Sequence, residues 1–335
     1  IYSLEQGKTF YTSNAGLPVL RQEICKYVER KYNVSYNHKN EILITVGGSE
    51  AIDMGLRCVL DPGDEVIIPQ PAYVSYEPCT IMAGGKPVII DLKAENEFRL
   101  TPEEFEAAIT PKTKVLILPF PNNPTGAIME AKDLEAIIPI IIKHDLIVMS
   151  DEIYAELTYT GKHVSIASYP GMKERTILIN GFSKAFAMTG WRLGYACGPA
   201  EIIEQMTKLH QYAIMCAPTL SQYGAIEAVK NSDEEVENMV KQYNQRRRFL
   251  LSELERLGLD CFEPGGAFYV FPSIKKTGMT SEEFATKLLE SQKLAVVPGN
   301  AFGRSGEGFI RISYAYSIDN LKEGIRRIEE FLKNV

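Results

Sequence analysis

Short apolar runs alternate with segments of helical periodicity through the first two thirds of the chain. Most of the runs are rich in Val, Ile and Leu, which predicts buried strands at 41–46, 65–68, 87–92, 114–118, 146–150, 176–179 and 193–197. Apolar residues three and four positions apart predict helices between them, at 18–31, 49–60, 103–109 and 131–144. Pro139 is expected to kink or split the last of these helices. Strands that alternate with helices predict an α/β fold with a mostly parallel sheet between helices.

The last third of the chain has a different pattern. A long charged helix with an apolar stripe is predicted at 233–257, and shorter helices at 281–291 and 319–333 accompany strands at 267–271, 294–297 and 309–313. A length of 335 residues fits about two domains. We therefore expect a large domain at 1–230 and a smaller α+β domain at 231–335 that begins with the long helix.

Composition narrows the classes of protein. Hydrophobic residues make up 45% of the chain and charged residues 24%, as in globular proteins with ample core. The net charge of -7 argues against a nucleic-acid partner, and the longest apolar runs are too short to cross a membrane. The six cysteines are scattered without a CxxC pair or a signal peptide, which favours a cytoplasmic protein with reduced thiols. The four histidines lack metal-ligand spacing, so we expect no metal site.

Lys184 carries the strongest chemical signal, because it follows the predicted strand 176–179 closely. Sites of α/β folds lie at the carboxyl ends of their strands, and a lysine among apolar groups can lose its proton and form Schiff bases. Arg192, eight residues later, offers a fork of donors that suits a phosphate. Pyridoxal phosphate carries both an aldehyde and a phosphate, so the pair indicates a site for it. A surface lysine after a strand is the common alternative.

A glycine turn, Val46-Gly47-Gly48-Ser49-Glu50-Ala51, joins the first strand to the next helix. The backbone amides of Gly48, Ser49 and Glu50 would bind an anion at the helix N-terminus, with the Ser49 hydroxyl as a further donor. A tight turn capped by Ser49 explains the pattern equally well. The serine-hydrolase elbow G-x-S-x-G is disfavoured, because Ala51 stands at its second glycine.

Polar residues also follow two central strands. In the loop Pro119 to Gly126, the Asn123 amide can donate to a ring hydroxyl or phenolate, unless the loop is a turn without a ligand. Asp151 ends the strand 146–150, where a buried carboxylate needs a partner such as a protonated pyridine nitrogen. Tyr154 would reach the same ring oxygen as Asn123. A helix-capping aspartate and a half-buried tyrosine are the alternatives.

Two further side chains are candidates for contacts with a ligand. Tyr73 follows the strand 65–68 and can stack on a cofactor ring, although an aromatic residue there is more often part of the core. Arg311 lies in the apolar strand 309–313, so it must point toward something polar. A substrate carboxylate would suit it, and so would an internal salt bridge.

These motifs occur in a fixed order: GGSEA, PAY, NNPTG, DEIY, SKAFAMTGWR, PGGAFY and FIRISYA. From about Tyr11 to its end the chain resembles the class I and II aminotransferases of PLP fold type I. The similar branch contains the bacterial aspartate, aromatic and acetyl-diaminopimelate aminotransferases. The resemblance implies a large domain with a mostly parallel seven-stranded sheet and a small α+β domain. It also implies transfer of an amino group from an amino acid to a 2-oxo acid, in a ping-pong cycle between the PLP and PMP forms of pyridoxal 5'-phosphate.

The resemblance implies a role for each candidate. The catalytic residues are Lys184, which carries the cofactor and moves the substrate proton, Asp151, which faces the pyridine nitrogen, and Tyr154. Tyr154 and Asn123 bind the ring oxygen, and Tyr73 stacks on the ring. The implied phosphate contacts are Gly48, Ser49, Glu50, Ser183 and Arg192. Arg311 and Asn123 bind the substrate, with Arg311 on its α-carboxylate.

Tyr11 matches a tyrosine that reaches the phosphate of the other subunit, which implies a homodimer with shared active sites. The chain begins with Ile1 rather than Met. The family has an N-terminal segment that covers the site, and we expect such a segment to precede Ile1.

The sequence alone is compatible with several functions. Aspartate-type transfer to 2-oxoglutarate is the first expectation, although no second arginine can be assigned to a distal carboxylate. Aromatic or N-acetyl-diaminopimelate donors are alternatives, and so is a PLP-dependent C–S lyase of the same fold. A transcription regulator with an aminotransferase-like domain would need a basic winged helix upstream, and the N-terminal residues are not basic.

Overall fold

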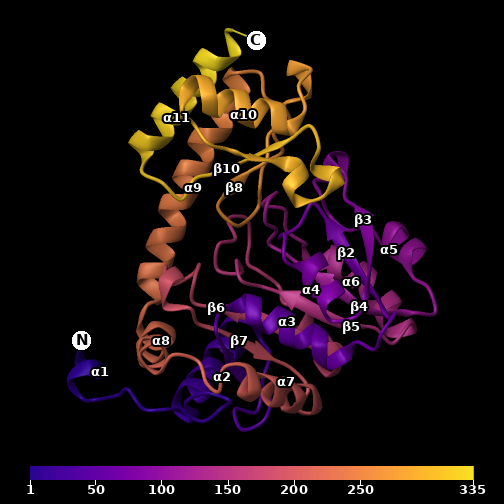
Figure 1. Ribbon diagram of the computed structural model, residues 1–335, viewed down its shortest axis with the longest axis vertical. Coiled ribbons are helices and arrows are strands. Elements are labelled where there is room, and N and C mark those ends of the chain that lie inside the picture. The colour runs from indigo at the N-terminus through magenta and orange to yellow at the C-terminus, as the bar shows by residue number, and fades with distance from the viewer. Residues whose placement is uncertain (335) are drawn as a thin grey trace.

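A seven-stranded sheet forms the centre of the molecule in this computed structural model, which describes residues 1–334 (Figure 1). Its strands are β1 (Ile42–Thr45), β2 (Glu65–Gln70), β3 (Lys86–Asp91), β4 (Thr113–Leu118), β5 (Ile147–Asp151), β6 (Thr176–Gly181) and β7 (Gly194–Cys197). Their order is β1-β7-β6-β5-β4-β2-β3, and β7 runs antiparallel to its neighbours β1 and β6. The other neighbouring pairs are parallel, so the predicted mostly parallel α/β sheet is confirmed.

Helices cover both faces of this sheet. One face packs against α3 (Gly48–Val59), α4 (Tyr76–Met82) and α7 (Ala200–Ala213). The other face packs against α2 (Pro18–Tyr32), α5 (Pro102–Ala108), α6 (Ala131–Lys143) and α8 (Thr219–Asn231). Successive side chains of a strand point to opposite faces, so Leu43 joins the first core while Ile42 and Ile44 join the second. Both faces of the sheet are therefore covered, which explains why most positions of its central strands are apolar.

Several helices differ from the prediction. α6 continues through Pro139, so the expectation of a split helix was wrong. Pro139 lies on the exposed side of α6, where the carbonyl that loses its helical hydrogen bond can face water. The sequence patterns did not predict α4, α7 or α8. The buried side of α8 contains small and polar residues, which hide its helical periodicity, among them Ser221, Gln222, Ala225 and Ala228.

A second, three-stranded sheet lies in the last third of the chain. Its strands are β8 (Tyr269–Val270), β9 (Val297–Pro298) and β10 (Ile310–Ser313), in the order β8-β10-β9. It packs with α9 (Asp233–Arg256), α10 (Ser281–Gln292) and α11 (Ile318–Leu332) around a separate apolar cluster. Figure 1 shows α9 running from the neighbourhood of α8 to that of α10 and α11. The boundary near residue 230 falls between α8 and α9, and as a division into two domains it stays a prediction.

The loop after β4 brings the two sheets together. Gly126 in this loop has a φ of +76°, and an added Cβ would lie 2.4 Å from Pro264 and 2.9 Å from the carbonyl oxygen of Gly266. The backbone N–H of Gly266 donates to the carbonyl of Gly126 at 2.9 Å. Segments around the second sheet therefore meet the carboxyl edge of the large sheet.

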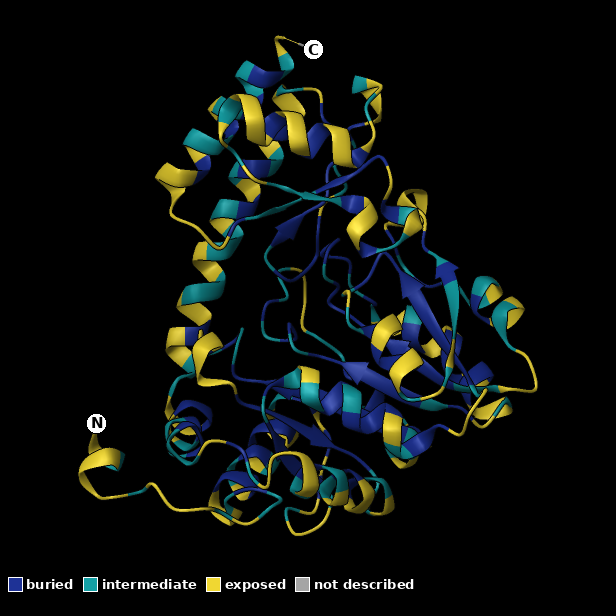
Figure 2. Cartoon of the chain, in the orientation of Figure 1, coloured by how far each residue is buried: buried dark blue, intermediate teal, exposed yellow. Residues whose placement is uncertain are grey.

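The exposed residues lie on the outer sides of the helices and on the N-terminal segment. Most strands of the large sheet are buried and the outer sides of helices are exposed, as Figure 2 shows. The short helix α1 (Tyr2–Glu5) lies on an exposed N-terminal segment that extends away from the sheet. Within residues 1–334, no helix combines the length and apolar character that crossing a membrane requires.

Candidate active site

A cavity of about 340 Å³ lies between the carboxyl edge of the large sheet and β10. Its lining includes most of the residues selected from the sequence: Gly48, Ser49, Tyr73, Asn123, Asp151, Tyr154, Ser183, Lys184, Arg192 and Arg311. Two other candidates, Glu50 and Tyr11, do not line it. The carboxyl ends of parallel strands meet at one sheet edge, which is why motifs far apart in sequence converge here.

Lys184 lines this cavity and lies shortly after β6 in the chain. Its Nζ is 5.5 Å from the ring centre of Tyr154 and 5.4 Å from that of Phe268. Burial lowers the pKa of Lys184, and the positive charges of Arg311 and Arg192 lower it further, against the opposing effect of Asp151. More of the side chain is therefore a neutral amine, which is the nucleophilic form.

Asp151 is the last residue of β5 and is buried. Its Oδ2 accepts a hydrogen bond of 2.7 Å from the Tyr76 hydroxyl, and its Oδ1 accepts one of 3.2 Å from the backbone N–H of Ile153. Burial raises the pKa of Asp151, and these two hydrogen bonds oppose that rise. Among the ion pairs of the described residues, none includes Asp151. A cation in the cavity would therefore stabilise its charged form.

Tyr76 lines the cavity but was not among the site residues predicted from the sequence. It is the first residue of α4, and its ring packs edge-on against Tyr73 with centroids 5.7 Å apart. The sequence patterns did not predict α4, so nothing placed Tyr76 on the cavity side. Its place three residues after Tyr73, in the segment that follows the predicted strand 65–68, is the signal that could have identified it.

We call Asn123, Tyr269 and Arg311 the β10 end of the cavity. Arg311 Nη1 donates to Asn123 Oδ1 at 2.8 Å. The guanidinium carbon of Arg311 lies 4.5 Å from the ring centre of Tyr269 and 4.8 Å from that of Phe302. Arg311 Nε is buried and has no hydrogen-bond partner within residues 1–334. The predicted internal salt bridge is absent from these contacts, and the free donors suit an anion such as a carboxylate.

Two tyrosines that line the cavity contact each other through their hydroxyl groups. The hydroxyls of Tyr154 and Tyr269 are 3.0 Å apart and buried. Burial raises the pKa of Tyr154 well above its usual value, so its hydroxyl stays protonated and can donate. Tyr269 belongs to the motif PGGAFY but was not selected as a site residue, because its 115-residue separation from Tyr154 hid their contact.

We call Gly47, Gly48, Ser49 and Arg192 the turn end of the cavity. Gly47, with a φ of +80°, is the N-cap of α3, and no side chain caps the first N–H groups of this helix. An added Cβ at Gly47 would lie 2.8 Å from Arg192 Nη2, so the guanidinium lies over the turn. Free N–H groups, the helix dipole and an arginine are suited to binding an anion.

Ser49 is neither the helix cap nor the serine-hydrolase nucleophile that the sequence offered as alternatives. It is the second residue of α3 rather than its cap, because Gly47 is the N-cap. Its Oγ lies 3.3 Å from the Tyr73 hydroxyl. A serine nucleophile needs a hydrogen-bonded base such as a histidine, whereas Ser49 contacts a tyrosine hydroxyl.

Glu50 and Tyr11 lie outside the cavity lining. The Glu50 carboxylate turns back to accept the backbone N–H of Val46 and the Nδ1 of His210, so only its backbone belongs to the turn. Tyr11 lies on the N-terminal segment and is 77% exposed. In a single chain Tyr11 therefore does not contribute to the site.

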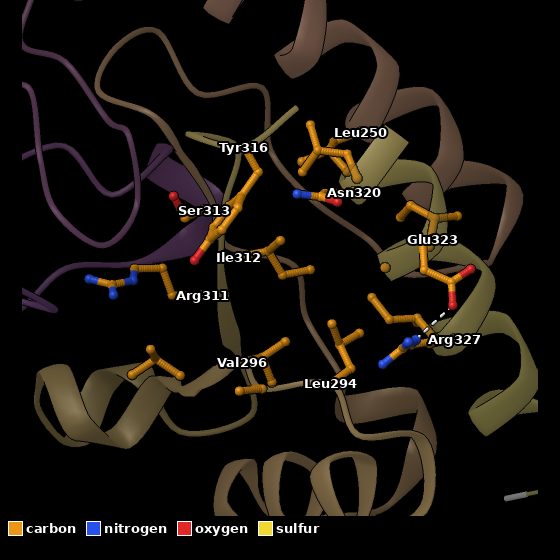
Figure 3. Close-up of a pocket in the computed structure, with 16 residues that line it drawn as sticks. Leu250, Leu294, Val296, Arg311, Ile312, Ser313, Tyr316, Asn320, Glu323 and Arg327 are labelled. Atoms are coloured by element: carbon orange, nitrogen blue, oxygen red, sulfur yellow. Dashed lines mark hydrogen bonds and ion pairs between the residues drawn. The ribbon is translucent and has the colours of Figure 1, made fainter. Parts of the chain in front are cut away.

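A second cavity of about 500 Å³ lies beside β10 and α11 (Figure 3). Leu294, Val296 and Ile312 form an apolar part of its wall. The guanidinium of Arg311 points away from this wall, and Arg327 Nε donates to Glu323 Oε1 at 2.8 Å. The described lining of this cavity contains no lysine, and its carboxylate, Glu323, is paired with Arg327, so it is not the candidate active site.

Comparisons with known proteins agree with this geometry. The family described as aminotransferase class I and II matches residues 3–328. An aspartate aminotransferase of Pyrococcus abyssi is 48% identical over 334 residues, which are 99% of this chain and 86% of the relative. Aromatic-amino-acid aminotransferase 2 of Thermococcus litoralis is 45% identical over the same shares. The crystal structure of an aromatic aminotransferase from Pyrococcus horikoshii has a TM-score of 0.98 and 46% identity, covering 99% of this chain and 90% of that one.

Proposed function

The chain belongs to the class I and II aminotransferase family, and we propose that it moves amino groups from an amino acid to a 2-oxo acid with bound pyridoxal 5'-phosphate. One observation carries the proposal. A lysine of lowered pKa shares a cavity with a buried carboxylate that has no cationic partner among the described ion pairs. When bound, this cofactor supplies an aldehyde for the lysine and a ring that withdraws electrons from the substrate.

The residues present suit this cofactor. Asp151 would face the ring nitrogen, because its burial calls for a positive partner. The free N–H groups and Arg192 at the turn end would hold the phosphate, with Ser183 nearby. The Asn123 carbonyl oxygen is taken by Arg311, so its NH₂ group is left to donate to the ring oxygen together with Tyr154. Tyr73 would cover the ring face.

The chain's own groups can perform the proton chemistry. Arg311 would hold the substrate carboxylate through its unused donors, which orients the α-carbon. Lys184, as a neutral amine, can remove a proton from that carbon and later return one. Tyr154, Phe268 and Tyr269 pack around the lysine and exclude water, which strengthens the interactions of charged groups in the site.

Borohydride reduction of the yellow holoprotein, followed by peptide mapping, tests the cofactor assignment. We expect a stable pyridoxyl label on Lys184. A label on another lysine, or a protein that binds no pyridoxal phosphate, would contradict the proposal.

The proposed donor class is dicarboxylic, with aspartate or glutamate and 2-oxoglutarate. Support comes from the relative named as an aspartate aminotransferase. One observation favours an aromatic donor as the second candidate. The cavity wall holds Tyr73, Tyr76, Tyr154 and Tyr269, while Arg192 and Arg311 are the arginines that line it within residues 1–334. A wall of this kind suits an aromatic side chain.

Steady-state kinetics decide between these donors. The dicarboxylic proposal expects a higher kcat/KM for aspartate than for tyrosine or phenylalanine. A tenfold advantage of an aromatic donor, about 1.4 kcal/mol of transition-state binding, would overturn the donor class but leave the reaction in place.

We also propose that two copies share their active sites. Tyr11 is 77% exposed and does not line its own cavity, and the exposed side chains of Phe10, Trp191 and Tyr212 add apolar surface. A mixture of Tyr11→Phe and Lys184→Ala chains tests this directly. In a mixed dimer one site keeps both native residues, so mixing should restore activity that neither variant has alone. No restoration, or a fully active monomer, would contradict shared sites.

A cytoplasmic location completes the proposal. It rests on the six scattered cysteines, which are typical of proteins with reduced thiols. Cell fractionation with a tagged chain checks it, and recovery of the protein outside the cytoplasmic fraction would refute it.

A further inference from the structure

The Glu50 carboxylate makes contacts that the proposed chemistry does not use. Glu50 is the third residue of α3, and its Oε2 accepts the backbone N–H of Val46, the residue before the N-cap. Its Oε1 lies 2.8 Å from Nδ1 of His210, which is on α7 and fully buried. Neither Glu50 nor His210 lines the cavity. A carboxylate beside an anion-binding turn would repel an anion, so its presence there needs an explanation.

The contacts of Glu50 with Val46 and His210 connect the turn to the strand before it and to a neighbouring helix. Glu50 links the strand side of the turn, at Val46, to the first turn of the helix, as reciprocal capping contacts do elsewhere. His210 then ties Glu50 to α7, which packs against α3. The Thr45 hydroxyl donates to the Gly47 carbonyl at 2.9 Å, so the peptide groups of the turn are held from this direction as well.

Histidine is suited to this position by its ring N–H donor. Nδ1 faces a carboxylate, so it carries a proton and donates. His210 Nε2 is buried and has no hydrogen-bond partner in the described part of the chain, so the ring is oriented by Glu50 alone. Donation from His210 draws the charge of Glu50 away from the free N–H groups of the turn and leaves them available to a phosphate.

We propose that Glu50 and His210 are positioning residues that hold the Val46–Glu50 turn in its anion-binding conformation and so determine the affinity for the cofactor phosphate. The inference rests on the proposed cofactor. It assigns no contact between either side chain and the cofactor.

Glu50→Gln is the central variant, because it keeps the shape of the side chain. The Gln oxygen can still accept from one partner, but its NH₂ group must then face the second donor. His210→Asn removes the link to α7 and provides an independent test if one variant folds poorly. Asp53→Asn is the matched control, since Asp53 is a half-buried carboxylate on the same helix, one turn later, and pairs with Arg57 at 2.9 Å rather than with the glycine turn.

The measurement is the Kd of the apoprotein for pyridoxal phosphate and for pyridoxal, which lacks the phosphate. We expect Glu50→Gln and His210→Asn to weaken pyridoxal phosphate binding by roughly tenfold, the usual result of leaving a buried donor unpaired. Pyridoxal binding should change little, and Asp53→Asn should bind both as the unaltered protein does.

The outcomes are distinguishable. Unchanged binding of pyridoxal phosphate by both variants would overturn the inference. Equal losses for pyridoxal phosphate and pyridoxal would also overturn it, because they indicate a general structural defect rather than a role at the phosphate. Failure of the unaltered protein to bind pyridoxal phosphate would instead refute the proposed function.

Discussion

The turn end of the cavity relies on backbone conformation, whereas the β10 end relies on packed side chains. At the turn end, Gly47 and Arg192 both have positive φ values, +80° and +51°, and Arg192 is exposed. Arg192 Nη1 is held by the carbonyl of Thr189 at 2.9 Å. At the β10 end, Arg311 lies between the rings of Tyr269 and Phe302 and is held by the side chain of Asn123.

This difference indicates how each end should respond to substitution. A turn of positive φ tolerates little change at its glycine, because an added Cβ strains the backbone. A packed guanidinium tolerates little change of shape, because its donors and its stacking both depend on a planar group. Substitutions at the turn end should therefore weaken cofactor binding, and substitutions at the β10 end should weaken substrate binding.

The largest effect is expected between the two ends, at Lys184. Lys184→Ala should lower transamination by roughly four orders of magnitude or more, as removal of a catalytic nucleophile does in other enzymes. Both ends stay intact in this variant, so pyridoxal phosphate should still bind, without a covalent bond. Single-turnover assays and cofactor titration check the two parts. Substantial residual activity would show that another group performs the proton transfer.

Asp151→Ala should have the next largest effect. Loss of the carboxylate leaves the ring nitrogen without its electrostatic partner in a water-poor site, so kcat should fall by roughly 10²-fold or more. Binding of substrate at the β10 end should change much less. Asp53→Asn, which alters a half-buried carboxylate that does not line the cavity, is the control. Activity within a few-fold of normal would rule out the ring-nitrogen role.

Arg311→Lys and Arg192→Lys compare the two ends directly. Arg311→Lys keeps the charge but loses the planar fork, so kcat/KM should fall by roughly 10- to 100-fold for the amino donor and the oxo-acid acceptor alike. Its Kd for pyridoxal phosphate should be nearly normal. Arg192→Lys should show the reverse pattern, with weaker cofactor binding and a smaller change in substrate KM at saturating cofactor. Identical profiles would refute the division into two ends.

Gly47→Ala tests the backbone at the turn end with a smaller expected effect. The new Cβ would meet Arg192 Nη2 at 2.8 Å, and the φ of +80° adds strain of about 1–3 kcal/mol. Cofactor affinity should fall several-fold. Gly161→Ala is the matched control, since it has a φ of +71° and no heavy atom within 4 Å of the added Cβ. It should lose stability but keep its cofactor affinity.

The smallest predicted effect is a pH dependence of apoprotein stability. The pKa of Lys184 is lowered from its ordinary value of 10.5, so the folded state binds its proton less tightly than the unfolded state. This cost to stability is fully present below the folded pKa and disappears as the pH rises toward 10.5. Lys184→Met should therefore stabilise the apoprotein at neutral pH, and its advantage should shrink at alkaline pH. Urea titrations across this range check the trend, and a constant difference would contradict it.

Much of the large sheet and of the cavity was predictable because the signals are local. Each parallel strand is a short apolar run buried on both faces, and its period and length are visible in the chain. Lys184, Asp151 and Asn123 follow such strands directly, and the carboxyl ends of parallel strands share one edge. The glycine turn before α3 is equally local. The ends of β8 and β9 were poorly predicted, since each pairs over only two residues.

Contacts between distant residues were decided only by the tertiary structure. Tyr76 lies in a helix with no clear periodicity, and its bond to Asp151 spans 75 residues. The contacts of Tyr154 with Tyr269, Glu50 with His210 and Asn123 with Arg311 span 115, 160 and 188 residues. Hydrophobic periodicity states which face of an element is buried, but not which element packs there. The sequence by itself therefore determined the strands, the glycine turn and the reactive lysine. The tertiary packing determined which distant side chains contact and orient the site residues.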